Sequence, residues 1–392
     1  MTLTWDVTAA TPSDVAAFGA PVFRNKAEST PFPAFTAPQA SPKAPWSLGA
    51  FEPSAAVKLG FLGNPFARGL RANGGQSLRE LRSAFSVDQC SRFRLTESLE
   101  ALDDTLGAFM REGVNVLAVA GGDGTLHHAV NALNRLGGGT PWPGTLLVLR
   151  GGTLNIVSRS LGPAIDPAAA LRAFVQGRAT ADTRVGDIVA KTVPMLTIDH
   201  AELGRRYGFL FGSEMVKNAL EMYDQFGGGY GGLSRFMFEV ARGFAFRGEL
   251  WQKERWRLDP PTTGARAEDD TRTFEAPKYA AAIACAVDLV INGGVRAVRR
   301  APGARGFYTR IITETRTPQL LKMIPSLMSE GHPTGVADLT EASRLSLRGS
   351  YTIDGECFGD SSRERRSPAA SVTVSAEHTI RFVTPSLSSS RA

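Results

Sequence analysis

The sequence predicts an α/β domain followed by a β-rich domain, and three observations lead to this fold class. Runs at 116–120 and 145–149 that are apolar except for Thr145 are typical of strands that are buried on both faces of a parallel sheet. A glycine-rich turn follows each run, and segments with a helical period of 3.6 residues alternate with the strands. After about residue 182 the pattern changes to short β runs, which indicate a β-rich sandwich.

The composition divides the chain into four expected segments. Residues 1–55 contain eight of the 23 prolines and no sustained apolar period, which predicts a mostly disordered Pro/Ala-rich leader. Residues 56–182 would form a doubly wound, three-layer α/β domain, and residues 183–370 a β-sandwich domain. Residues 371–392 would supply C-terminal strands, which could return to the first domain, and then a tail.

Individual elements follow from periodicity and turn residues. In the α/β domain we expect a strand at 57–62, a helix at 95–110 with Thr96 as a candidate cap, and a strand from Val114. The helix after that strand should end at glycines 137–139, and Asp166-Pro167 should open another helix that ends at Gly177. The second domain should contain helices at 213–225, 233–246 and 320–328, and strands at 279–290, 306–313, 344–347, 351–353, 371–375 and 379–383.

Charge and cysteine content narrow the class of protein. The 392-residue chain has a formal net charge of +6, an excess that suits nucleotides, anionic lipid surfaces or nucleic acid. No basic run is interleaved with aromatic residues, so we expect no nucleic-acid partner. The three cysteines lack metal-ligand spacing and suit a reducing compartment. With no apolar run long enough to span a bilayer and no N-terminal signal, a cytoplasmic protein is expected.

The stretch Gly121-Gly122-Asp123-Gly124-Thr125 is the first candidate site. A buried strand that ends at glycines and feeds a helix directs backbone N–H groups and the helix dipole at an anion. Glycine also lets the main chain approach a phosphate closely. Two further glycine turns, at 63–69 and 151–155, end neighbouring strands, so all three belong at one crevice of a doubly wound sheet. The sequence therefore predicts a phosphate-binding site.

Asp354-Gly355-Glu356 is the second candidate site. It ends a β run, and two residues at this spacing face the same side while the chain is extended. Paired carboxylates can accept the proton of an attacking hydroxyl and hold a magnesium ion. The alternative is a hairpin turn, which Asp-Gly often forms.

Four motifs in this order resemble the diacylglycerol kinase catalytic family, which includes bacterial lipid kinases and the sphingosine and ceramide kinases. They are Gly63-Asn64-Pro65 with Gly69, the 121–125 stretch, Gly152-Thr153-Leu154-Asn155 and Asp354-Gly355-Glu356, and the resemblance covers residues 57 to 385. It implies an ATP- and Mg²⁺-dependent lipid kinase that phosphorylates a primary hydroxyl of a lipid such as diacylglycerol, ceramide or a sphingoid base.

The resemblance also implies roles for individual residues. Glu356 would be the general base, Asp354 would support it or bind metal, and Asp123 would orient the phosphates through magnesium or water. Asp182, preferred to Asp187, would contact the substrate. ATP would be bound by Asn64, Pro65, Thr96, Gly121, Gly122, Asp123, Gly124, Thr125, Leu126, Gly152, Thr153 and Asn155.

The implied partner is a lipid at the membrane surface, reached by peripheral contact at the inner face of the membrane. The oligomeric state stays open, a homodimer being one option. NAD kinases share the GGDGT motif and a similar N-terminal domain, so an NAD kinase-like phosphotransferase is an alternative. No Asn-Glu pair follows the third loop, which speaks against that alternative.

The chain departs from the family pattern at three places. His128 replaces a customary Glu after the glycine stretch, Ile156 replaces an Asp, and Ala304-Arg305-Gly306 replaces an Asp-Asp-Gly that binds a structural magnesium. Adjacent histidines such as His127-His128 suggest a packed or exposed pair rather than a metal site. These departures suggest a second alternative, a nucleotide-binding regulator without turnover, although the retained carboxylates of 354–356 argue against it.

Overall fold

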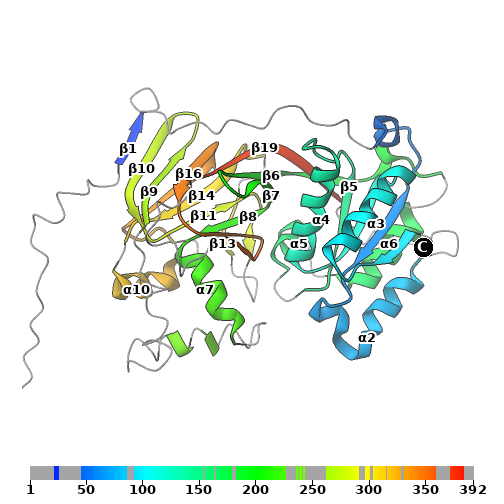
Figure 1. Ribbon diagram of the computed structural model, residues 1–392, viewed down its shortest axis with the longest axis horizontal. Helices are drawn as coiled ribbons and strands as arrows, with labels where there is room; N and C mark the ends of the chain where they lie inside the picture. Colours follow the sequence, from blue (N-terminus) through cyan, green and yellow to red (C-terminus); the bar gives the residue numbers. More distant parts are fainter. Residues whose placement is uncertain are drawn as a thin grey trace, which may run out of the picture.

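The computed structural model has an α/β part and a β-rich part that lie side by side, with β6 and β19 running between them (Figure 1). It describes residues 22–25, 46–85, 92–152, 155–162, 165–178, 182–226, 235–236, 238–240, 242, 262–290, 296–300, 303–314, 316–327, 331–358 and 371–383.

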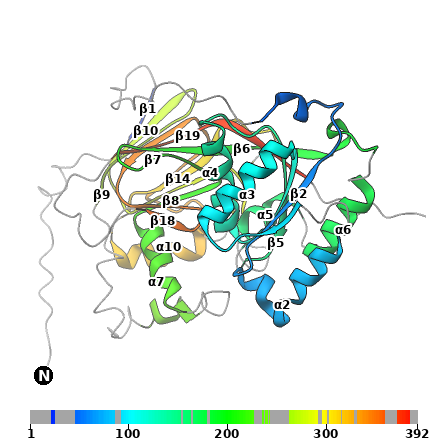
Figure 2. The ribbon, with the colours of Figure 1, turned by 45° about the vertical axis from the view of Figure 1, so that its right-hand side comes forward.

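The α/β part contains a parallel sheet in the order β3-β2-β4-β5. Its strands are β2 (Leu59–Gly63), β3 (Phe93–Leu95), β4 (Val116–Gly121) and β5 (Thr145–Arg150). Helices α3 (Leu99–Glu112) and α4 (Asp123–Leu136) pack on one face, and α2 (Arg68–Ser83) and α6 (Pro167–Arg178) on the other (Figure 2). The predicted three-layer α/β fold is confirmed. The sequence reasoning did not identify α2 or the short α5 (Ile156–Leu161).

The start of α3 corrects the predicted cap. Ser98, not Thr96, is the N-cap, and its hydroxyl accepts a hydrogen bond from the backbone N–H of Ala101 at 3.1 Å. Thr96 lies before the helix, where its N–H donates to the carbonyl of Gly63. The helix ends at Gly113, whose φ of 75° permits the left-handed cap.

The β-rich part is a sandwich of antiparallel strands. The smaller sheet has the order β15-β14-β11-β8-β17-β18 among the described residues, and the larger sheet continues from the α/β part through β19, β16, β9, β10 and β1. Apolar side chains from both sheets, such as Leu345 and Phe307, form one buried core. The strands are β1 (Val22–Asn25), β6 (Ala190–His200), β7 (Gly204–Gly208), β8 (Leu210–Ser213), β9 (Thr262–Glu268), β10 (Arg272–Tyr279), β11 (Ala281–Cys285), β12 (Leu289–Val290), β13 (Arg296–Val298), β14 (Phe307–Ile312), β15 (Val336–Ala342), β16 (Arg344–Arg348), β17 (Tyr351–Ile353), β18 (Glu356–Phe358) and β19 (Ser371–Val383).

Strand β19 connects the two parts. One of its edges pairs with β6 over most of its length; the other pairs with β16 in its first half and, in parallel, with β5 at Arg381 and Phe382. The two strands predicted at 371–375 and 379–383 are thus one strand, whose register shifts between Ser375 and His378. The irregularity explains why the sequence reads as two runs.

Two segments of the predicted leader are ordered. Residues 22–25 form β1, which pairs with β10, and Trp46 is buried in the core beneath α3 and α4. A 3-10 helix, η2 (Leu48–Phe51), follows. The leader is therefore not uniformly without structure.

Helices α7 (Met215–Asp224) and α10 (Thr317–Leu327) flank the smaller sheet. Most of the helix predicted at 233–246 lies outside the described residues. No helix within the described part of the chain is long and apolar enough to cross a membrane.

Candidate active site

The three glycine loops meet at the carboxyl edge of the parallel sheet. The N–H of Asn64 donates to the carbonyl of Ala120, the N–H of Gly69 to that of Gly151, and the N–H of Gly151 to that of Gly121, at 2.8 to 3.0 Å. This edge is where ligands bind in open α/β folds. The predicted convergence of the loops is therefore present.

Glycine is required here because backbones touch. A β-carbon on Gly151 would lie 2.7 Å from Leu70 Cγ and 3.0 Å from the backbone nitrogen of Gly121, and one on Gly152 would collide with the α-carbon of Gly122. The second and third loops thus stack backbone against backbone, an approach that glycine permits.

The first loop is tied to the second by side chains. Asn64 Nδ2 donates to Thr125 Oγ1 at 3.2 Å, while Asn64 Oδ1 accepts from the N–H of Phe66 at 2.9 Å. Pro65 lies within this turn. Two of the polar side chains predicted to contact nucleotide, Asn64 and Thr125, therefore lie together beside Gly121.

Asp123 bridges the second and third loops. Its carboxylate accepts the N–H groups of Ile156 and Val157 at 2.9 and 3.1 Å, and so caps the start of α5. Burial raises the pKa of Asp123 to about 6, although the two N–H bonds act in the opposite direction.

Asn155 acts within its own loop. With a φ of 50°, it accepts from the N–H of Gly152 at 2.9 Å and donates to the carbonyl of Gly152 at 2.8 Å. Its amide is therefore occupied by the third loop. Thr153, predicted to contact ATP, lies outside the described residues.

Asp354 and Gly355 form the turn of the β17–β18 hairpin, with φ values of 53° and 96°. The expectation that Asp354 and Glu356 share one face of an extended strand is wrong, and the hairpin alternative is the observed geometry. Asp354 is buried: its Oδ1 accepts the N–H groups of Phe209 and Leu210, both at 2.9 Å, and its Oδ2 lies 3.3 Å from His127 Nδ1.

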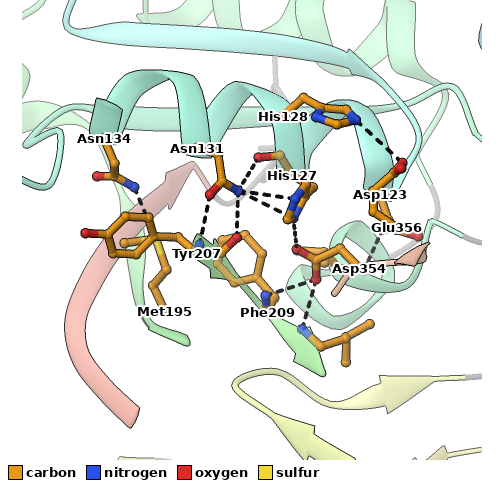
Figure 3. Close-up of polar contacts among 12 residues, drawn as sticks. Asp123, His127, His128, Asn131, Asn134, Met195, Tyr207, Phe209, Asp354 and Glu356 are labelled. Carbon is orange, nitrogen blue, oxygen red and sulfur yellow. Dashed lines mark hydrogen bonds and ion pairs between the residues drawn. The ribbon is translucent and has the colours of Figure 1, made fainter. Parts of the chain in front are cut away.

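Glu356 lies next to the second glycine loop (Figure 3). Its Oε1 would be only 2.5 Å from a β-carbon built on Gly124, so the carboxylate fills the space that glycine leaves. The side chain is 42% exposed, and Oε1 is 3.6 Å from His128 Nε2. His128 is the leading cause of a lowered pKa at Glu356.

One face of α4 contacts the β-rich part through residues that sequence reasoning missed. Asn131 donates to the carbonyl of Tyr207 at 2.7 Å and accepts its N–H at 2.9 Å, and His127 contacts Asp354 (Figure 3). The sequence did contain a signal for this contact: His127, Asn131 and Asn134 are polar residues whose spacing places them on one face of the helix.

Three other predicted site residues lie at different places around the α/β part. Leu126 is 1% exposed and belongs to the core, so only its backbone faces the loops. Thr96 is largely buried near the end of β2, at the same edge of the sheet as the glycine loops. Asp182 is exposed beside Thr183, which pairs with Val57 before β2, so it lies at the sheet edge opposite the glycine loops.

The loops fit a nucleotide better than the carboxylates fit a metal. Stacked glycine backbones at a helix N-terminus suit the phosphates of ATP. The carboxylates of Asp123 and Asp354, the expected metal ligands, accept protein N–H groups, and within the described ranges no group of three or more His, Cys, Asp or Glu could hold a metal ion. A magnesium site built from protein side chains is therefore not supported.

Comparisons with known proteins agree with this geometry. Residues 58–186 match the model of the diacylglycerol kinase catalytic domain family. Two solved structures from Bacillus anthracis str. Sterne, each described as "a putative diacylglycerol kinase", have TM-scores of 0.51 at 15% identity. The similarity covers 83% of this chain and 97% and 96% of theirs, and shows a shared fold. No curated protein sequence matches the chain.

Proposed function

We propose that this protein is an ATP-dependent lipid kinase, and that Glu356 is its general base. The observation that carries the proposal is the position of the Glu356 carboxylate against Gly124, in the loop suited to phosphates. A base at this point is within reach of a hydroxyl that attacks the terminal phosphate.

In this mechanism the protein contributes chiefly positioning and charge. Backbone N–H groups of the glycine loops hold the phosphates, and Asn64 and Thr125 line the same edge. Glu356 accepts the proton of the acceptor hydroxyl as its oxygen bonds to the γ-phosphorus. The bond from that phosphorus to the β,γ-bridging oxygen breaks, and ADP leaves.

The choice of a lipid acceptor is supported by the match of residues 58–186 to the diacylglycerol kinase catalytic domain. A diacylglycerol, a ceramide or a sphingoid base would each offer a primary hydroxyl. We propose that the acceptor is taken from a membrane surface by peripheral contact. Magnesium would arrive with the nucleotide, since Mg²⁺ usually keeps several waters and binds through phosphates with few protein ligands.

The test is phosphate transfer from γ-labelled ATP to a panel of acceptors: diacylglycerol, ceramide and sphingosine in mixed micelles, and NAD in solution. We expect label in one of the lipids. Label in NAD alone would support the NAD kinase-like alternative. ATP binding without transfer to any acceptor would support a nucleotide-binding regulator, and either result would overturn the proposal.

A further inference from the structure

Two histidine–carboxylate pairs join α4 to the β17–β18 hairpin. His127 faces Asp354 at 3.3 Å, and His128 faces Glu356 at 3.6 Å (Figure 3). The residues are adjacent on the helix, and their partners are two apart on the hairpin. The hairpin is therefore held against the phosphate loop by the first turns of the helix that this loop begins.

The first pair, His127 and Asp354, is buried and bound to other protein groups. His127 and Asp354 each have 1% exposed side chains, and Asp354 also accepts the N–H groups of Phe209 and Leu210. Both oxygens of Asp354 are thus engaged with the protein. This pair fixes the hairpin turn but leaves no free oxygen for a substrate proton.

The second pair is open to solvent. The His128 side chain is 36% exposed and that of Glu356 42%. Among the described residues, His128 is the one side chain within salt-bridge distance of Glu356. The opposite side of the carboxylate faces Gly124, whose missing side chain provides room for Oε1.

A carboxylate beside a triphosphate faces repulsion between like charges. Without a partner it would turn away from the phosphates or take up a proton, and either change would remove a base from the attacking hydroxyl. The imidazole of His128 can keep the carboxylate in place and ionised. It is well placed to do so, because α4 begins in the loop that would hold the phosphates.

We propose that His128 is a positioning residue that holds the Glu356 carboxylate over Gly124, facing the acceptor hydroxyl. This inference rests on the proposed lipid kinase function. His128 need not touch the substrate; it acts through Glu356.

The test compares His128→Ala and His128→Gln with Arg135→Ala as the control. Arg135 is on the same helix but pairs with Asp103 at the surface, away from the loops. We expect His128→Ala to lower kcat ~10- to 100-fold, with the KM for ATP unchanged within about twofold. Gln carries an N–H donor of similar reach and should recover most of kcat.

A second readout needs no turnover. The ¹⁵N chemical shift of His128 Nε2 should differ between the wild type and Glu356→Gln, and should be unchanged by Arg135→Ala. An active wild type whose kcat is unaffected by His128→Ala would overturn this inference alone. A ¹⁵N chemical shift of His128 Nε2 that is the same in the wild type and in Glu356→Gln would also overturn it. Absence of transfer by the wild type to every acceptor would overturn the proposed function and this inference with it.

Discussion

Replacing Gly124 by alanine should displace Glu356 without altering its chemistry. The new methyl carbon would lie 2.5 Å from Glu356 Oε1, whereas ordinary contacts begin at 3.4 Å. The carboxylate must therefore move by about 1 Å, a misplacement that can cost about 100-fold in rate. Gly124 is in the first turn of α4 and has no positive φ, so alanine suits its backbone. The helix itself should gain about 0.5–1 kcal/mol.

The assay is kcat at saturating ATP and lipid, with ATP affinity from calorimetry and stability from urea unfolding. Gly107→Ala on α3 is the matched control, because its β-carbon would meet only Arg111 Nη1, at 3.5 Å. We expect Gly124→Ala to lose about 100-fold in kcat while ATP affinity and folding are retained. A kcat within about threefold of the wild type would refute this reasoning. Loss of ATP binding would also refute it, since the methyl group would then act on the phosphates.

Three further predictions concern the supporting groups. Asp354→Ala leaves the buried N–H groups of Phe209 and Leu210 unpaired and should lower the free energy of unfolding by ~2–4 kcal/mol; an unchanged urea midpoint would contradict this. Because burial raises the pKa of Asp123 to about 6, its contribution to stability is complete below pH ~4 and is lost as pH rises through 6. Asp123→Asn should therefore reduce the fall in the free energy of unfolding across pH 4–7 by up to ~3 kcal/mol. The same pH dependence of stability in this variant and in the wild type would contradict the raised pKa of Asp123. Gly151→Ala would press a methyl group against the Leu70 side chain and the backbone of Gly121, so calorimetry should show ATP affinity at least ~10-fold weaker. Unaltered affinity would mean that ATP binding does not need the close approach of these loops.

The α/β part could be predicted because its signals are local. Strands such as 116–120 are apolar throughout, since helices cover both faces of the sheet, and each ends at glycines that the neighbouring backbone requires. The three glycine loops could be placed at one crevice because parallel strands end at the same edge. Residue types and their spacing in the sequence were sufficient to predict that the three loops converge.

The geometry of the β17–β18 hairpin could not be predicted from local signals, because long-range contacts determine it. Asp354 adopts a positive φ while its carboxylate binds backbone groups of residues 209 and 210, about 145 positions earlier. The pairing of His128 with Glu356 likewise depends on two parts of the chain that no local pattern relates. Strand β19 shows the same limit, since its continuity depends on β6.

The central claim is that Glu356 accepts a proton during phosphate transfer from ATP to a lipid. It is tested most directly by the rate of transfer in Glu356→Gln, with Glu377→Gln on the exposed part of β19 as the matched control. Loss of a general base should lower kcat by ~10²- to 10⁴-fold while ATP still binds, and the control should match the wild type. A Glu356→Gln protein that transfers phosphate at the wild-type rate would contradict the account.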